Sequence, residues 1–159
     1  MKKQSSTRVQ PGILQKYSVL FMLFIIFWLT AGRSLLGSDG WLSLVIVSSW
    51  VPLLLAFTGV LAVTSSIRYR RTGYVFSKTM NVLFSSFLAG AFVGGFFLMD
   101  GGDTPESIGS VFTKMTGISD FAHPLIDVTQ NICTVLMCVM PVLMMVMLIF
   151  VFVDKGAKK

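Results

Sequence analysis

Four long stretches without a charged residue divide this chain. They are bounded by Lys16 and Arg33, Asp39 and Arg68, Lys78 and Asp100, and Asp127 and Asp154. In that order they contain 16, 28, 21 and 26 residues, most of them apolar. A bilayer core about 30 Å thick requires roughly 20 helical residues, and a helix satisfies its own backbone hydrogen bonds there. The sequence therefore predicts four transmembrane helices, at approximately 17–36, 41–64, 79–99 and 128–153.

The composition agrees with a polytopic membrane protein, because 54% of the residues are hydrophobic and only 13% are charged. The longest segment outside the predicted helices, residues 100–127, is too short to form a separate core. We therefore expect an all-α integral membrane protein in which residues 1–159 form a single membrane domain.

The basic residues predict how this domain is oriented. With four spans, eleven of the thirteen Lys and Arg residues fall on one side, and only Arg33 and Lys114 fall on the other. The cytoplasmic basic flank between the second and third helices consists of Arg68, Arg70, Arg71 and Lys78. By the positive-inside rule, both termini are expected in the cytoplasm, and the short loops favour a bacterial inner membrane. Such flanks attract anionic lipid, so nucleic acid is not an expected partner.

The first two predicted helices contain two features that need interpretation. A secretory signal peptide is the alternative for the first 32 residues, but the segment lacks an A-x-A cleavage site. We therefore interpret it as a helix whose Arg33 snorkels at the outer membrane surface. Pro52 lies inside the second helix, where its missing N–H predicts a kink.

The third predicted helix carries a ridge of small residues. Ser86, Gly90 and Gly94 recur every four residues, and Ala91 and Gly95 form an adjoining pair. Such a ridge allows another helix to approach closely. The partner is either another helix of this chain or a second copy of it.

The outer segment between the third and fourth helices predicts a short amphipathic helix over residues 104–116. Thr104 and Pro105 have the residue types of a helix start, and Gly117 is typical of a helix end. Its apolar face consists of Ile108, Val111, Phe112 and Met115. The helix is expected to lie on the outer membrane surface or to cap the bundle, and docking to an external partner is the alternative.

Two groups of side chains have metal-ligand chemistry, yet each has a simpler interpretation. The first group is Asp120, His123 and Asp127, and the second is Cys133, Met137, Met140 and Met144. A proton or metal site would suit the first group, and Cu(I) would suit the second. A loop before the fourth helix and ordinary apolar packing explain them more simply, so we expect no metal and no cofactor.

No predicted span contains a Lys, Arg, Asp, Glu or His residue away from its ends, although such residues usually mark pumps and ion-coupled carriers. The sequence also contains no catalytic triad signature, phosphate-binding loop or CxxC pair. We therefore expect neither an enzyme nor a carrier, and no small-molecule substrate is evident.

In span count and topology, the chain resembles inner-membrane immunity proteins for pore-forming colicins and, equally, small polytopic subunits of bacterial secretion or conjugation machines. The first hypothesis is a non-catalytic inner-membrane subunit of a cell-envelope assembly that binds other membrane proteins or associates with itself. The alternative is an immunity or exclusion protein against a pore-forming toxin or a competing element. A second alternative is a holin-like or channel-like pore.

Overall fold

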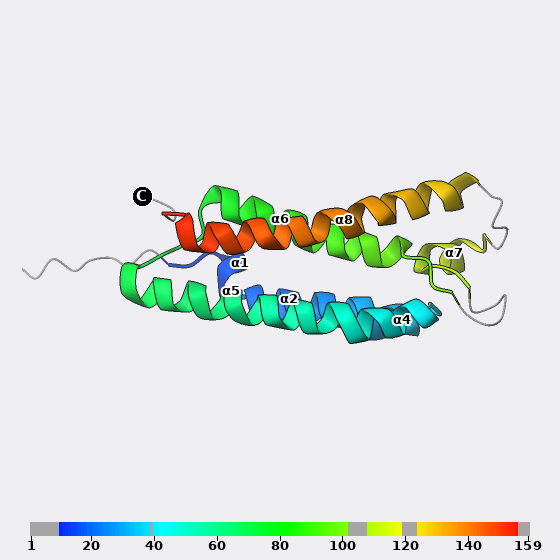
Figure 1. Ribbon diagram of the computed structural model, residues 1–159, viewed down its shortest axis with the longest axis horizontal. Helices are drawn as coiled ribbons and strands as arrows, with labels where there is room; N and C mark the ends of the chain where they lie inside the picture. The colour runs from blue at the N-terminus through cyan, green and yellow to red at the C-terminus, as the bar shows by residue number, and fades with distance from the viewer. Residues whose placement is uncertain (1–9, 39, 102–107, 119–123, 156–159) are drawn as a thin grey trace, which may run out of the picture.

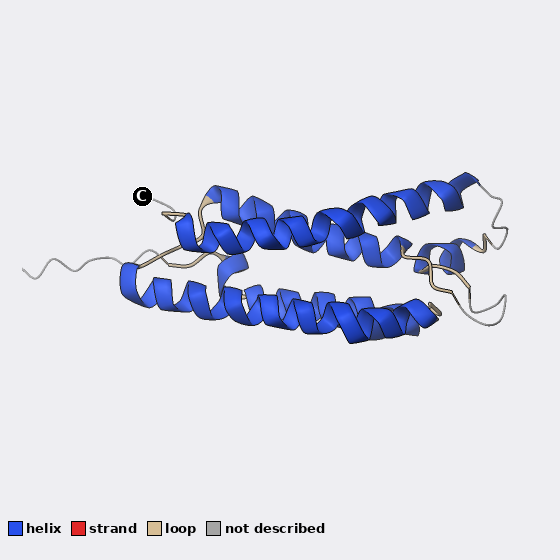
Figure 2. Cartoon of the chain, in the orientation of Figure 1, coloured by secondary structure: helices blue, strands red, loops and turns tan. Residues whose placement is uncertain are grey.

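The computed structural model describes residues 10–38, 40–101, 108–118 and 124–155, and the described part is helical without a named strand (Figures 1 and 2). Four of its helices are long and apolar enough to cross a membrane. They are Ser18–Leu35, Ser43–Thr72, Lys78–Phe97 and Pro124–Val153. The predicted all-α architecture with four candidate spans is thus confirmed, and the four helices support a multi-pass membrane protein.

The first two candidate spans form a helical hairpin. Its first arm contains α1 (Ile13–Lys16), α2 (Ser18–Phe27), the π-helical η1 (Trp28–Gly32) and α3 (Arg33–Leu35). Its second arm contains α4 (Trp41–Val45), the π-helical η2 (Ile46–Trp50) and α5 (Val51–Thr72). Gly37 has a φ of 80°, which a residue without a side chain adopts readily, and it allows the tight turn between the arms.

The backbone irregularity of the second arm lies just before Pro52. This proline is the second residue of α5, separated from η2 by Val51 alone. Because proline lacks an N–H group, the carbonyl four residues earlier cannot receive the usual helical hydrogen bond. A wider π turn at this position is a common way to accommodate such a break.

The second half of the chain forms another pair of helices, α6 (Lys78–Phe97) and α8 (Pro124–Val153), separated by the short α7 (Val111–Thr116). The side chain of Ser77 caps α6 by accepting a hydrogen bond of 3.2 Å from the backbone N–H of Met80. Pro141 lies inside α8, and Figure 1 shows that α8 changes direction along its length.

The core lies between these two pairs, with α2 beside α5 and α6 beside α8 (Figure 1). Side chains from all four candidate spans contribute to it. The buried set includes Met22, Ile25, Leu54, Phe57, Leu61, Met80, Phe84, Phe87, Met140, Met144 and Met147. Shape complementarity and dispersion hold such helices together, because lipid offers apolar groups an equally favourable environment.

Each end of the bundle gathers a different set of loops. At the Arg68 end, Gln15 donates a hydrogen bond to the carbonyl oxygen of Tyr74 (3.2 Å) and accepts one from the N–H of Phe76 (2.9 Å). At the opposite Arg33 end, the N–H of Trp41 donates to the carbonyl oxygen of Gly101 (2.7 Å). The described segments nearest to the two termini therefore lie at the same end, the Arg68 end.

Candidate interaction sites at the two ends of the bundle

The Arg33 side chain turns into the protein and is 0% exposed. Its Nη2 group donates to the carbonyl oxygen of Leu98 (2.8 Å) and to Oγ of Ser38 (2.9 Å). It also lies 3.7 Å from Oδ2 of Asp100. The prediction that Arg33 snorkels to the membrane surface is therefore wrong, because polar acceptors inside the bundle offer it a better-matched environment.

Asp100 is also held by the loop before α7 and by α4, in addition to Arg33. Its backbone pairs with Gly109 through two hydrogen bonds of 2.9 and 3.0 Å, and its Oδ2 atom accepts a bond of 2.5 Å from Ser43. A Cβ atom on Gly40 would lie 2.2 Å from the carbonyl oxygen of Gly101, so only glycine fits this approach. We call the set Arg33, Ser38, Ser43, Asp100 and Gly109 the Arg33 junction.

The Arg33 junction joins the hairpin loop to the segment after α6. A charge buried in this way costs several kcal/mol in lost hydration, which an opposite charge and directed hydrogen bonds offset. Within the described part of the chain, Nε and Nη1 of Arg33 have no hydrogen-bond partner. The junction therefore depends on Nη2 and on the nearby Asp100 charge.

The short helix α7 beside the junction differs from the predicted helix over 104–116. The predicted start at Thr104 and Pro105 lies outside the described residues. In the described part, the helix begins at Val111, after a reciprocal capping box between Ser110 and Thr113. Its C-cap is Gly117 with a φ of 70°, at the residue where the sequence predicted the end.

The four residues of the predicted apolar face do not share one surface. Ile108 precedes the helix, and Val111 is buried. Phe112 packs against Phe97, with ring centroids 5.3 Å apart, whereas Met115 is 66% exposed. Val111 and Phe112 thus attach α7 to the bundle, and Met115 points away from it.

The small-residue ridge of α6 contacts two other helices of the same chain. A Cβ atom on Gly90 would lie 3.1 Å from Sδ of Met140, and one on Gly94 would lie 3.8 Å from Cβ of Leu136, so both glycines face α8. Gly95 instead contacts Trp28, whose Nε1 would be 2.6 Å from an added Cβ atom. Ala91 is buried in the core, whereas Ser86 is exposed.

The Arg68 end holds a second polar cluster. The guanidinium of Arg68 donates to the carbonyl oxygens of Val151 and Asp154, the latter at 2.6 Å, and it covers the ring of Tyr74 at 4.1 Å from the centroid. The carbonyl groups at the end of α8 have no partner within the helix, so this cation satisfies them and opposes the helix dipole. The Tyr74 hydroxyl donates to Oδ2 of Asp154 (3.1 Å), and burial and this carboxylate raise the pKa of Tyr74.

The four residues of the predicted basic flank therefore differ in role. Arg68 is partly buried and connects α5 to α8, whereas Arg70, Arg71 and Lys78 are exposed. The structure distinguishes one structural arginine from three cations that remain accessible.

The predicted metal-ligand groups are placed only in part. Asp120 and His123 lie outside the described residues, and Asp127 is in the first turn of α8. In the second group, Cys133, Met140 and Met144 are buried, and Met137 is half-buried. Among the described residues, no group of three or more His, Cys, Asp or Glu side chains is placed to hold a metal ion.

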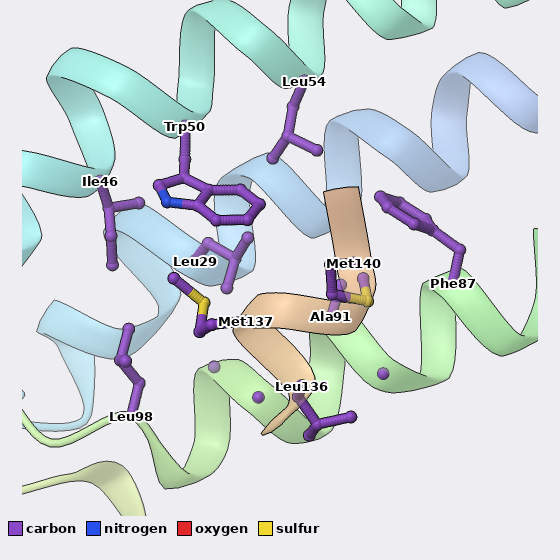
Figure 3. Close-up of a pocket in the computed structure, with 13 residues that line it drawn as sticks. Leu29, Ile46, Trp50, Leu54, Phe87, Ala91, Leu98, Leu136, Met137 and Met140 are labelled. Atoms are coloured by element: carbon purple, nitrogen blue, oxygen red, sulfur yellow. The ribbon is translucent and has the colours of Figure 1, made fainter. Parts of the chain in front are cut away.

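A small apolar cavity of about 30 Å³ lies between the two helix pairs (Figure 3). Leu29 and Trp50 line it from the hairpin, and Met137 and Met140 line it from α8. An apolar cavity of this kind normally stays dry. Its size and lining indicate imperfect packing between the two pairs rather than a ligand site.

The sequence contained a signal for the Arg33 junction that our interpretation did not use. Arg33 and Asp100 have opposite charge and lie at the same end of the first and third predicted helices, so their pairing was open to prediction. Arg68 gave no comparable signal, because three similar basic residues lie close to it in sequence. The chain matches no protein-family model, no curated protein and no solved structure.

Proposed function

We propose that this chain is a multi-pass protein of a bacterial inner membrane, with its Arg68 end in the cytoplasm. The described cations at the Arg68 end support this orientation. They are Lys16, Arg68, Arg70, Arg71, Lys78 and Lys155. Positive charge near helix ends is retained on the cytoplasmic side, so both termini would lie there.

The proposed role is that of a non-catalytic subunit of a multi-protein cell-envelope assembly, such as a bacterial secretion or conjugative-transfer apparatus. The glycines of the α6 ridge and the buried methionines of α8 are used inside the chain, so contact with a partner falls to other surfaces. Large apolar side chains are instead exposed at the Arg33 end. They are Leu35 (79%), Leu36 (43%), Trp41 (62%) and Met115 (66%).

The observation that carries this role is the combination of those exposed side chains with the fixed Arg33 junction. The junction holds the hairpin loop, the end of α6 and the start of α7 in one arrangement. A binding surface loses less entropy on association when it is ordered beforehand. We call the exposed side chains of Leu35, Leu36, Trp41 and Met115 the apolar rim. An external component of the assembly would therefore bind to a preorganised surface at this rim.

Reporter fusions test the orientation. A reporter that is active only in the cytoplasm should be active at both termini, and a periplasmic reporter should be active when inserted near Met115. Activity of the two terminal fusions in opposite compartments would contradict the proposed topology.

Site-specific photocross-linking tests the role in cells that contain the full gene neighbourhood. A photoreactive residue at Leu35, Trp41 or Met115 should yield discrete adducts with another envelope protein. Matched controls at Val135 and Ile149, which are exposed on the apolar surface of α8, should yield lipid adducts only. Recovery of the chain alone, as a monomer in mild detergent and without adducts from the rim, would count against a subunit.

Two simple assays separate the other hypotheses from this role. An immunity protein should protect a sensitive cell when it is expressed with no other gene supplied, whereas an assembly subunit should not. A pore should dissipate the membrane potential on induced expression, whereas a subunit should leave it intact.

A further inference from the structure

A polar hollow opens at the Arg68 end between α1 and the last turns of α5. Its volume is about 220 Å³, and its lining includes Gln15, Lys16, Ser66, Tyr69 and Arg70. Two of these side chains, Lys16 and Arg70, carry positive charge and come from different elements of the fold. We call this the Lys16–Arg70 hollow.

The wall of this hollow is held in place by Gln15. Both ends of its amide are engaged with the segment between α5 and α6, at Tyr74 and Phe76. By contrast, Lys16 and Arg70 are exposed, and neither forms an ion pair with another described residue. Nζ of Lys16 lies 5.1 Å from the centroid of the exposed Tyr17 ring. The hollow thus combines a fixed backbone with two solvent-exposed cations, of which Lys16 would exchange a weak contact with the Tyr17 ring for a ligand.

A second hollow adjoins the first and is largely apolar. It has a volume of about 290 Å³ and is lined by Ala62, Val63 and Ile67 together with Ser66 and Arg70, which also line the Lys16–Arg70 hollow. Ala62, Ser66 and Arg70 are spaced four residues apart, so they lie on one face of α5. The apolar hollow therefore extends from the cations toward the middle of the helix.

We propose that the two hollows form one binding site for an anionic phospholipid. Lys16 and Arg70 bind the phosphate of the head group, and the acyl chain lies along Ala62, Val63 and Ile67. Arginine offers a planar fork of donors that matches phosphate oxygens, and lysine adds a second charge. Arg70 lies two residues before the end of α5, which is where a helix leaving the apolar core meets lipid head groups.

This site rests on the proposed insertion in a membrane, and native mass spectrometry of the full chain in mild detergent tests it directly. Added phosphatidylglycerol should be retained about tenfold more strongly than phosphatidylcholine, because its head group has a net negative charge, whereas the choline cation of phosphatidylcholine offsets the phosphate and repels Lys16 and Arg70. The double variant Lys16→Gln/Arg70→Gln should lose this preference. The matched variant Arg71→Gln/Lys78→Gln removes the same charge from exposed positions that do not line either hollow, and it should keep the preference.

A variant without a charge change tests the shape of the site. Ser66 lines both hollows and is exposed, so Ser66→Phe should block the lipid while the chain still folds, as judged by an unchanged gel-filtration profile. Unchanged retention of phosphatidylglycerol in this variant would overturn the proposal. Equal losses in the two double variants would also overturn it, because they would show nonspecific attraction to positive charge.

A competition experiment with inorganic phosphate distinguishes a lipid head group from a free phosphate anion as the ligand of the hollow. Displacement of bound phosphatidylglycerol by inorganic phosphate alone would assign the hollow to a free anion and overturn the lipid proposal, whereas persistence of the lipid adduct would support it. The reporter fusions described above fail or succeed independently of this binding measurement. A failure of the lipid site can thus be distinguished from a failure of the proposed membrane role.

Discussion

The carboxylate of Asp100 lies 3.7 Å from the guanidinium of Arg33, and both side chains are fully shielded from solvent. This pair links the end of the first candidate span to the residues that follow the third. A buried ion pair is not in itself evidence of high stability, because its desolvation offsets much of the attraction. Removal of only one of the two charges nevertheless destabilises the protein strongly, so single substitutions can test the pair.

Replacement of Arg33 by Met should destabilise the protein by about 3–5 kcal/mol, because it leaves the Asp100 carboxylate buried without its cation. The carbonyl oxygen of Leu98 also loses its donor. Thermal unfolding of the purified protein in detergent measures the change. The double variant Arg33→Met/Asp100→Leu should recover part of the lost stability, and a double variant less stable than both single variants would contradict the ion-pair interpretation.

Replacement of Arg68 by Ala should lower the free energy of unfolding by about 1–2 kcal/mol, since the terminal carbonyl groups of α8 lose a charged donor. Amide hydrogen exchange should increase in the last turns of α8. The control is Arg71→Ala, which removes an exposed cation from the same helix. Equal effects of the two variants would show that net charge, rather than the contact with α8, determines the result.

Replacement of Gly95 by Ala should destabilise the bundle by about 1–3 kcal/mol through overpacking. The added Cβ atom would lie 2.6 Å from Nε1 of Trp28, which donates a hydrogen bond of 2.9 Å to the carbonyl oxygen of Phe92. Gly90→Ala should cost less, because the atom it approaches belongs to the flexible side chain of Met140. Gly59→Ala is the control, since open space surrounds that position, and thermal unfolding should rank the variants in this order.

Alkaline pH should weaken the Arg68 end through Tyr74. Burial and the Asp154 carboxylate raise the pKa of Tyr74 above the usual value of about 10, so the folded state favours the neutral phenol. The resulting stabilisation is complete below pH of about 10 and is lost as the pH rises above it. Ultraviolet titration should show a tyrosinate step at strongly alkaline pH that Tyr74→Phe removes, and persistence of this step in the variant would contradict the assignment.

The four candidate spans could be predicted because charged residues bound the apolar stretches, and a bilayer admits few other structures. Gly117 likewise identified a helix end by its residue type. The start of α7 was harder to predict from the sequence. Ser110 and Thr113 cap the helix through polar side chains, and a search for apolar periodicity does not detect them. The contacts of Arg33 and Arg68 depend on partners distant in sequence, and helical periodicity alone does not identify those partners.

The π-helical turn η1 (Trp28–Gly32) determines the direction in which Arg33 points. From Ile25 to Arg33 the chain advances eight residues, which in an uninterrupted α-helix amounts to two full turns and about 80° more. The π turn takes up one surplus residue, and this returns Arg33 to the inward phase already occupied by Met22 and Ile25. Relaxation of η1 to a regular α-helix at unchanged length would thus preserve the hydropathy of this segment and yet rotate Arg33 by about 80° away from the inward face. Deletion of one residue within η1 would instead remove the surplus residue, and a regular α-helix would then keep Arg33 inward. The backbone hydrogen-bonding pattern, and not only the composition, therefore determines where the charge of Arg33 lies.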